Sequence, residues 1–186
     1  MVGWVRFGPL APFTVAPAMF FTLPQALAVV CTLVIAIAGW LGIAPAAYAQ
    51  DNTVDYTLTD LSFRDFSGKQ LSGTSFAAAE MREANFRKAN LSKTILTKAS
   101  FLRANLSFAD LSRTFADRVI FDGADLSNAI FTEALLTSSS FSEANITGAD
   151  FSGAIIDRFQ VAQMCKYADG VNEVTGISTR DSLGCR

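Results

Sequence analysis

The sequence predicts an all-β solenoid, a fold in which short strands stack coil upon coil. The first observation is a large apolar residue that returns at every fifth position between Leu61 and Ile156. Nineteen of these twenty positions hold Leu, Phe, Met or Ile, and Ala116 is the exception. A second series, two residues before the first, is rich in alanine. Positions five apart are rotated by ~140° around a helix, and each odd step changes face in a strand, so neither element alone buries such a series. A period of five therefore indicates a repeating unit that winds as a whole.

The N-terminal region has the composition of a targeting segment. Residues 7–50 carry no charge, and residues 26–44 form an apolar run. A motif of small residues, A-x-A, ends at Ala49, so we predict cleavage between Ala49 and Gln50, which makes residues 1–49 a signal peptide. The alternative is an uncleaved N-terminal membrane anchor, because a run of this length can span a bilayer. In either case the remainder of the chain is exported.

The repeats carry a family resemblance. The stretches "ANLSFADLS", "GADLSNAIF" and "EANITGADFSGA" resemble the A-(D/N)-L-x-x units of pentapeptide-repeat proteins. The resemblance covers residues 59–158, and it implies a right-handed quadrilateral β-helix with one unit per side and about five coils. At ~4.8 Å between stacked strands the rod would be roughly 24 Å long. Residues 50–58 would form a short linker or N-terminal cap. Because Arg64 and Lys69 occupy slots that are small elsewhere, we expect an irregular first coil.

A column of apolar side chains is expected on one outer wall. With twenty residues per coil, the position before each large residue faces outward, and on one wall four successive coils are apolar there: Ile95, Phe115, Leu135 and Ile155. Exposed stripes of this kind mark contact surfaces. We therefore predict a docking face for a second copy or for another exported protein. Two alternatives remain open: a flanking segment covers the stripe, or Phe115 turns inward because Ala116 leaves room.

The repeats stop after Ile156, and residues 159–186 are predicted to form a short α-helical cap and a disulfide-closed tail. Asp157 is the expected N-cap of the helix and Gly170 its end, followed by a loop-like segment. A cap is needed because the last coil would otherwise expose its core and its strand edges.

The cysteines support export. Cys31 lies in the leader, so Cys165 and Cys185 remain as an even pair, which predicts one disulfide in an exported chain. The pair is either a structural bridge or a regulatory dithiol that a thioredoxin-like partner could reduce. The segment "CKYADGVNEVTGISTRDSLGC" is similar to the C-terminal extension of lumenal pentapeptide-repeat proteins of cyanobacterial and chloroplast thylakoids. This resemblance implies the thylakoid lumen as the destination, with the periplasm as the alternative.

The composition argues against several classes of function. The sequence has no histidine, so no base of that kind can activate a hydroxyl, and we predict no catalytic residues. Two thiols without histidine make a metal site unexpected, and the absence of a glycine-rich phosphate loop argues against a cofactor or a small-molecule substrate. Apart from Arg6 the chain holds 14 basic and 17 acidic residues, a net charge of −3, which provides no electrostatic footprint for nucleic acid.

The predicted function is that of an exported, non-enzymatic structural or protein-interaction module. Its wall would bind a protein partner or a second copy, and assembly or stabilisation of a photosynthetic membrane complex is one hypothesis. The membrane itself would be contacted only through an uncleaved N-terminal segment. The alternative is a redox-regulated lumenal protein whose Cys165–Cys185 pair is a thioredoxin target. A DNA-mimic inhibitor of a topoisomerase is disfavoured by export and by cations in the middle of the rod, among them Lys88, Lys98 and Arg113.

Overall fold

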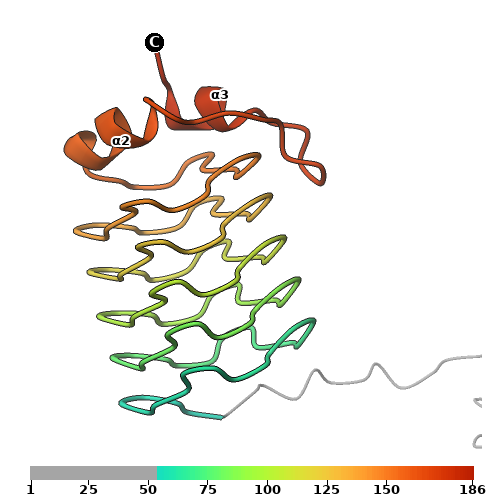
Figure 1. Ribbon diagram of the computed structural model, residues 1–186, viewed down its shortest axis with the longest axis vertical. Coiled ribbons are helices and arrows are strands. Elements are labelled where there is room, and N and C mark those ends of the chain that lie inside the picture. Colours follow the sequence, from blue (N-terminus) through green and yellow to red (C-terminus); the bar gives the residue numbers. More distant parts are fainter. Residues whose placement is uncertain (1–53) are drawn as a thin grey trace, which may run out of the picture. The chain divides into compact units, whose positions relative to one another are not determined.

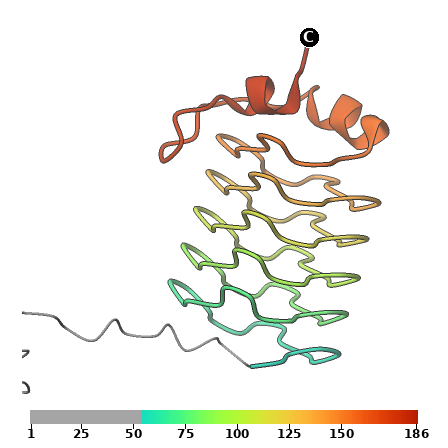
Figure 2. The same ribbon diagram turned by 180° about the vertical axis from the view of Figure 1, so that it is seen from behind.

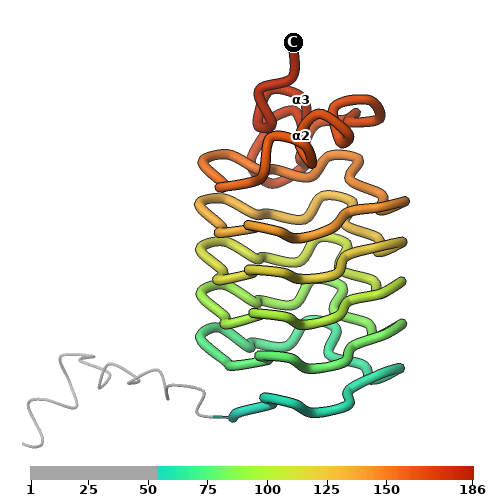
Figure 3. The backbone as a smooth tube through the Cα atoms, turned by 90° about the vertical axis from the view of Figure 1, so that its left-hand side faces the viewer, coloured from blue at the N-terminus to red at the C-terminus, as the bar shows by residue number. Residues whose placement is uncertain are grey.

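The computed structural model describes residues 54–186, and most of these residues form a stack of four-sided coils that ends before Arg158 (Figure 1). The predicted cleavage site at Ala49 and Gln50 lies outside the described residues. Isolated parallel bridges join residues twenty positions apart along the whole stack, from Asp55 to Ile155. The coils follow one another at a regular spacing in the backbone trace (Figure 3). One lap of the chain is therefore twenty residues, as the sequence predicts. None of the helices in residues 54–186 has the length and apolar character needed to cross a bilayer.

Each five-residue unit follows the same backbone course. A bridged residue is followed by a large inward residue, a two-residue turn and a small inward residue. In the unit that begins at Asp60, the backbone N–H of Leu61 donates to the carbonyl of Glu80 at 2.7 Å. The N–H of Phe63, in the turn, donates to the carbonyl of Arg82 at 2.9 Å. Every unit from Asp55 to Ala134 thus bonds to the coil above it through both its side and its corner.

The second residue of every turn lies in the left-handed region of backbone conformation. Fifteen of these corner residues are not glycine, and their φ angles run from 53° to 62°. Such a conformation costs about 1 kcal/mol or more per residue. The cost is offset because the corner N–H pairs with the next coil, as in Lys98, which donates to the carbonyl of Asp117 at 2.9 Å. The corners consequently accept Lys, Arg, Glu and Phe alike.

Two series of side chains fill the interior, and each forms four columns because a lap holds four units. The large residues of the five-residue series are buried from Leu71 to Phe151, and the alanines of the second series are buried beside them. Phenylalanines stack at the twenty-residue spacing: the ring centroids of Phe101 and Phe121 are 5.4 Å apart, and those of Phe121 and Phe141 are 5.1 Å apart. Each fully buried Phe or Leu contributes ~1.5–3 kcal/mol to stability, so the stack is held mainly by these columns.

The stack begins at Asp55, earlier than the predicted boundary at residue 59. Tyr56 takes the first large inward slot and stacks on Phe76 with ring centroids 5.0 Å apart. The first coil keeps the same bridges and turns as the others, so the expected irregularity is absent from its backbone. Arg64 and Lys69 differ from the later residues of their series only in that their side chains are exposed.

Two short helices lie over the last coil (Figures 1 and 2). Helix α2 spans Arg158–Met164 and ends earlier than the predicted end at Gly170. Helix α3 spans Thr179–Leu183, where the sequence predicted only a loop. The hydroxyl oxygen of Ser178 accepts the N–H of Asp181 and so caps α3. This Ser-x-x-Asp pattern is the sequence signal for the start of α3.

Candidate functional site

The predicted apolar column lies on one outer wall of the stack. Parallel bridges join Ile95 to Phe115, Phe115 to Leu135, and Leu135 to Ile155. The exposed fraction is 46% for Ile95, 49% for Phe115 and 60% for Ile155, and Leu135 is partly buried. We call these four residues the apolar stripe. Its side chains are held in a row by the same bridges that hold the backbone, so their spacing is fixed.

Phe115 does not turn inward, which removes one of the two alternatives. Ala116 itself fills the inward slot and is fully buried. The hydroxyl of Ser139, in the coil above, donates to the carbonyl of Ala116 at 2.6 Å. Within residues 54–186 the stripe also remains uncovered, as the exposed fractions of Ile95 and Ile155 show.

Charged corner residues border the stripe. The guanidinium Nε of Arg113 donates to Glu133 at 2.7 Å, and both side chains are more than half exposed. On the other edge Nε of Arg118 donates to Asp117 at 2.8 Å. Hydrogen bonds from the Thr137 hydroxyl and then from Arg118 lower the pKa of Asp117, so this carboxylate is ionised at neutral pH.

The opposite wall carries polar side chains that bond to the turns. The amide nitrogen of Asn85 donates to Asp65 at 3.0 Å, and Asn145 donates to Asp125 at 3.1 Å. Asp65 also accepts the backbone N–H of Ser67 at 2.9 Å, which together with the Ser67 hydroxyl lowers its pKa. These are Asx contacts that close the corners. Among residues 54–186 no group of three or more potential metal ligands occurs.

The C-terminal segment pairs with the free edge of the last coil. The N–H of Gly148 donates to the carbonyl of Asp169 at 2.8 Å, and the N–H of Phe151 donates to the Ser182 hydroxyl at 3.1 Å. Asp157 stands at the N-cap position of α2 but makes no side-chain cap. Its carboxylate accepts the N–H of Ser138 at 2.6 Å instead. The segment thereby satisfies backbone groups that a further coil would otherwise occupy.

The two cysteines hold the ends of this segment together. Cys165, just after α2, and Cys185, just after α3, form a disulfide. The guanidinium of Arg180 donates to the carbonyl of Cys165 at 3.0 Å, which adds a second link across the same junction. The disulfide therefore fixes α2 and α3 to each other.

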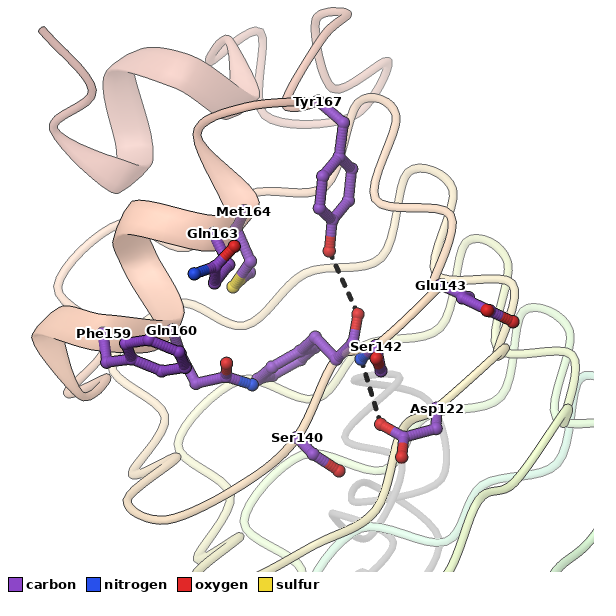
Figure 4. Close-up of a pocket in the computed structure, with 10 residues that line it drawn as sticks. Asp122, Ser140, Ser142, Glu143, Phe159, Gln160, Gln163, Met164 and Tyr167 are labelled. Carbon is purple, nitrogen blue, oxygen red and sulfur yellow. Dashed lines mark hydrogen bonds between the residues drawn. The ribbon is translucent and has the colours of Figure 1, made fainter.

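A cavity of about 470 Å³ lies between α2 and the last coils (Figure 4). The Tyr167 hydroxyl donates to the carbonyl of Phe141 at 3.0 Å, and Asp122 accepts the N–H of Ser142 at 2.9 Å. Partial burial, and to a lesser extent the charge of Asp122, raise the pKa of Tyr167. The Tyr167 contact holds the cap to the last coil, and the Asp122 contact joins two neighbouring coils.

Comparison with known proteins identifies the fold. The family model for pentapeptide repeats matches eight copies over residues 57–92, 84–123 and 120–157. The chain belongs to the pentapeptide-repeat family. Its coils are accordingly those of a right-handed quadrilateral β-helix, as the resemblance implied.

This pentapeptide-repeat protein is similar to proteins of the thylakoid lumen. It is 37% identical to a pentapeptide repeat protein of the Arabidopsis thaliana thylakoid lumen, whose crystal structure aligns over 79% of this chain and 99% of that one with a TM-score of 0.68. It is also 56% identical over 32 residues to the chloroplast thylakoid lumenal protein TL20.3 of the same plant, a match that covers 17% of this chain and only 11% of that protein. A pentapeptide repeat protein of Nostoc PCC 7120 is 20% identical, with 76% and 94% of the two chains covered and a TM-score of 0.44.

Proposed function

We propose that this protein is an exported, non-enzymatic interaction module of the thylakoid lumen that presents the apolar stripe to a protein partner. In this proposal residues 1–49 direct export, the residues between them and Asp55 connect them to the coils, and the coils serve as a rigid support. The observation that carries the proposal is the row of half-exposed apolar side chains at Ile95, Phe115 and Ile155.

The location is supported by two kinds of similarity. Both Arabidopsis relatives are lumenal proteins by name, and one of them covers most of this chain. The leader predicted from the sequence and the disulfide between Cys165 and Cys185 agree with an oxidising compartment across a membrane.

The rigidity of the wall supports a binding role. Ile95, Phe115 and Leu135 lie in backbone that is bonded to the coils above and below, and Ile155 lies in backbone bonded to the coil below. Little further ordering is therefore required when a partner binds. The entropic cost of ordering an interface is one of the main terms that oppose association. A pre-ordered apolar row lowers that cost.

Paired double substitutions test the proposal. Ile95→Ser with Leu135→Ser removes apolar surface from the stripe, and Ile120→Ser with Ile130→Ser makes a comparable change on neighbouring walls. Both variants are tagged in the organism that encodes the chain and recovered from the lumenal fraction. We expect partners that copurify with the unmodified protein to be lost from the stripe variant and kept by the control. Equal recovery from both variants, with circular dichroism unchanged, would contradict the role of the stripe.

A second candidate function is redox control of the cap. The disulfide between Cys165 and Cys185 is the observation that favours it, because the bond joins α2 to the end of α3 and both cysteines are only partly buried. Reduction by a thioredoxin-like partner would then release the segment that covers the last coil. A thiol-trapping experiment with a thioredoxin variant that lacks its resolving cysteine tests this candidate.

A further inference from the structure

We infer that the apolar stripe is the contact surface of a weak antiparallel dimer, in which a second copy of this chain packs its stripe against the first with the rods pointing in opposite directions. The inference rests on the proposed function of the stripe and names its partner. The argument comes from the charges on the two edges of the stripe.

The charged side chains that border the stripe change sign along the rod. The half beside Ile95 and Phe115 has four cations and one anion, a net charge of +3, at Lys93, Lys98, Arg113, Arg118 and Asp117. The half beside Leu135 and Ile155 has two anions and one cation, a net charge of −1, at Glu133, Asp157 and Arg158. The wall is therefore electrostatically polar along its length.

The positions of these side chains follow from the coil geometry. The stripe wall lies between two columns of corners. One column holds Lys93, Arg113 and Glu133, and the other holds Lys98 and Arg118. Asp157 follows Ile155 on the same side as the second column. Corner residues on one side of the wall therefore keep to that side throughout the stack.

An antiparallel pair matches opposite charges. In this pair a two-fold axis runs across the width of the wall, at the level midway between Phe115 and Leu135. Phe115 of one copy then lies opposite Leu135 of the other. This rotation places each column of corners opposite the same column of the second copy, with the coils in the reverse order. Arg113 then faces Glu133 of the second copy, and Lys98 faces the end of the last coil of the second copy, where Asp157 and Arg158 carry opposite charges. Complementary charges of this kind favour one mode of association over another.

A parallel pair matches like charges. A two-fold axis along the rod places one column of corners opposite the other column of the second copy, with equivalent coils at the same level. Lys93 would then face Lys98 of the second copy, and Arg113 would face Arg118 of the second copy. Like charges placed opposite each other are destabilising. The charges that border the stripe thus favour the antiparallel dimer over the parallel one.

The existing ion pair does not prevent the exchange. Arg113 and Glu133 are exposed by 62% and 58%, and exposed pairs of this kind are worth at most ~1 kcal/mol. Each can therefore turn toward the second copy at little cost. The stripe itself covers four coils, roughly 14 Å at ~4.8 Å per coil, so the contact falls among small interfaces that form transient complexes. We expect a reversible dimer of micromolar or weaker affinity.

Charge reversal distinguishes the arrangements. The protein recovered from the lumenal or periplasmic fraction after expression of the full chain is examined by sedimentation velocity over a concentration series. In the antiparallel dimer, Arg113→Glu and Glu133→Arg each raise the dissociation constant by about tenfold or more, and the two together restore it. Arg103→Glu is the matched control, because it makes the same charge change at an exposed corner that does not border the stripe, and it leaves the dissociation constant unchanged.

Three results would overturn the inference. Tighter association of Arg113→Glu indicates the parallel dimer, and equal weakening by Arg103→Glu indicates a general charge effect. A third is a chain that stays monomeric up to millimolar concentration. If such a monomer still loses its copurifying partner on Ile95→Ser with Leu135→Ser, the dimer is wrong and the proposed docking role stands. If it loses nothing, both are wrong.

Discussion

The side-chain amide of Asn172 donates a hydrogen bond to the carbonyl of Gly148 at 2.8 Å, across 24 positions of sequence. Its oxygen accepts the N–H groups of Val174 and Thr175, both at 2.9 Å. The side chain is almost fully buried, with 1% exposed. The backbones approach closely beside it, since a Cβ on Gly170 would lie 2.9 Å from the nitrogen of Gly148. One amide thus joins the C-terminal segment to the last coil.

Replacement of Asn172 by alanine is expected to detach this segment. The change leaves the carbonyl of Gly148 without its buried donor and two N–H groups without their acceptor, at a cost of ~1–3 kcal/mol for each buried group that stays unpaired. The free energy of unfolding in urea and the hydrogen exchange of residues 165–185 measure the effect. Asn145→Ala is the control, because Asn145 is exposed. Equal losses for the two variants would contradict the role of Asn172.

Two phenylalanines six positions apart are expected to differ sharply. Phe121 is fully buried between Phe101 and Phe141, whereas Phe115 is 49% exposed. Phe121→Ala should lower the free energy of unfolding by ~3–5 kcal/mol through cavity formation. Phe115→Ala should lower it by less than ~1 kcal/mol, because that ring already contacts water. Urea denaturation followed by circular dichroism checks both values, and similar midpoints would show that Phe115 also packs in the core.

Tyr167 is expected to make stability sensitive to alkaline pH. Burial raises the pKa of its phenol above the model-compound value of 10.0, so the folded state holds the proton more tightly than the unfolded state. The stabilisation is complete below pH 10 and is lost as pH rises through the folded-state pKa. Tyr167→Phe should cost ~1 kcal/mol at pH 7, where the bond to the carbonyl of Phe141 is lost. The difference in unfolding free energy between the two proteins should shrink above pH 10. A constant difference from pH 7 to 11 would contradict this assignment.

Removal of the disulfide is expected to loosen the cap and to leave the coils folded. The loop between Cys165 and Cys185 spans 20 positions, which corresponds to ~3 kcal/mol of loop-closure entropy. Because neither cysteine belongs to the buried columns between Leu71 and Phe151, the loss should be confined to the C-terminal segment. Hydrogen exchange of Cys165→Ser with Cys185→Ser checks this, with faster exchange expected in residues 157–185 and no change in residues 80–130. Unchanged exchange in both regions would remove the basis for redox control.

The sequence predicts the coils well because each inward slot accepts one class of residue. A period of five cannot be buried by a helix or a strand, and the twenty-residue bridges follow once four units close a lap. Tyr56 falls within the predicted linker of residues 50–58, although it continues the series of large residues at the five-residue spacing. The polar corners were not predictable in detail, since almost any side chain is accepted there.

The C-terminal segment was less predictable because distant contacts determine it. Helix α3 has only five residues, and its position depends on Thr179, whose hydroxyl donates to the carbonyl of Ile146 at 3.3 Å. The end of α2 is likewise followed by contacts with the last coil, such as that of Tyr167 with Phe141. Sequence spacing contains no information on such pairs. The spacing predicts the stripe as a column of apolar residues, whereas it does not identify the partner that binds the stripe.

Because one lap holds four units, a change in the number of units can move residues to another wall and still leave the core filled. Insertion of a single five-residue unit would leave every inward slot filled and every corner intact, yet it would rotate all later residues by a quarter turn. An insertion after Leu126 would move Leu135 and Ile155 to the next wall and split the stripe in two. Only insertions of four units lengthen the rod and preserve its faces, so changes in length should come in steps of a whole lap.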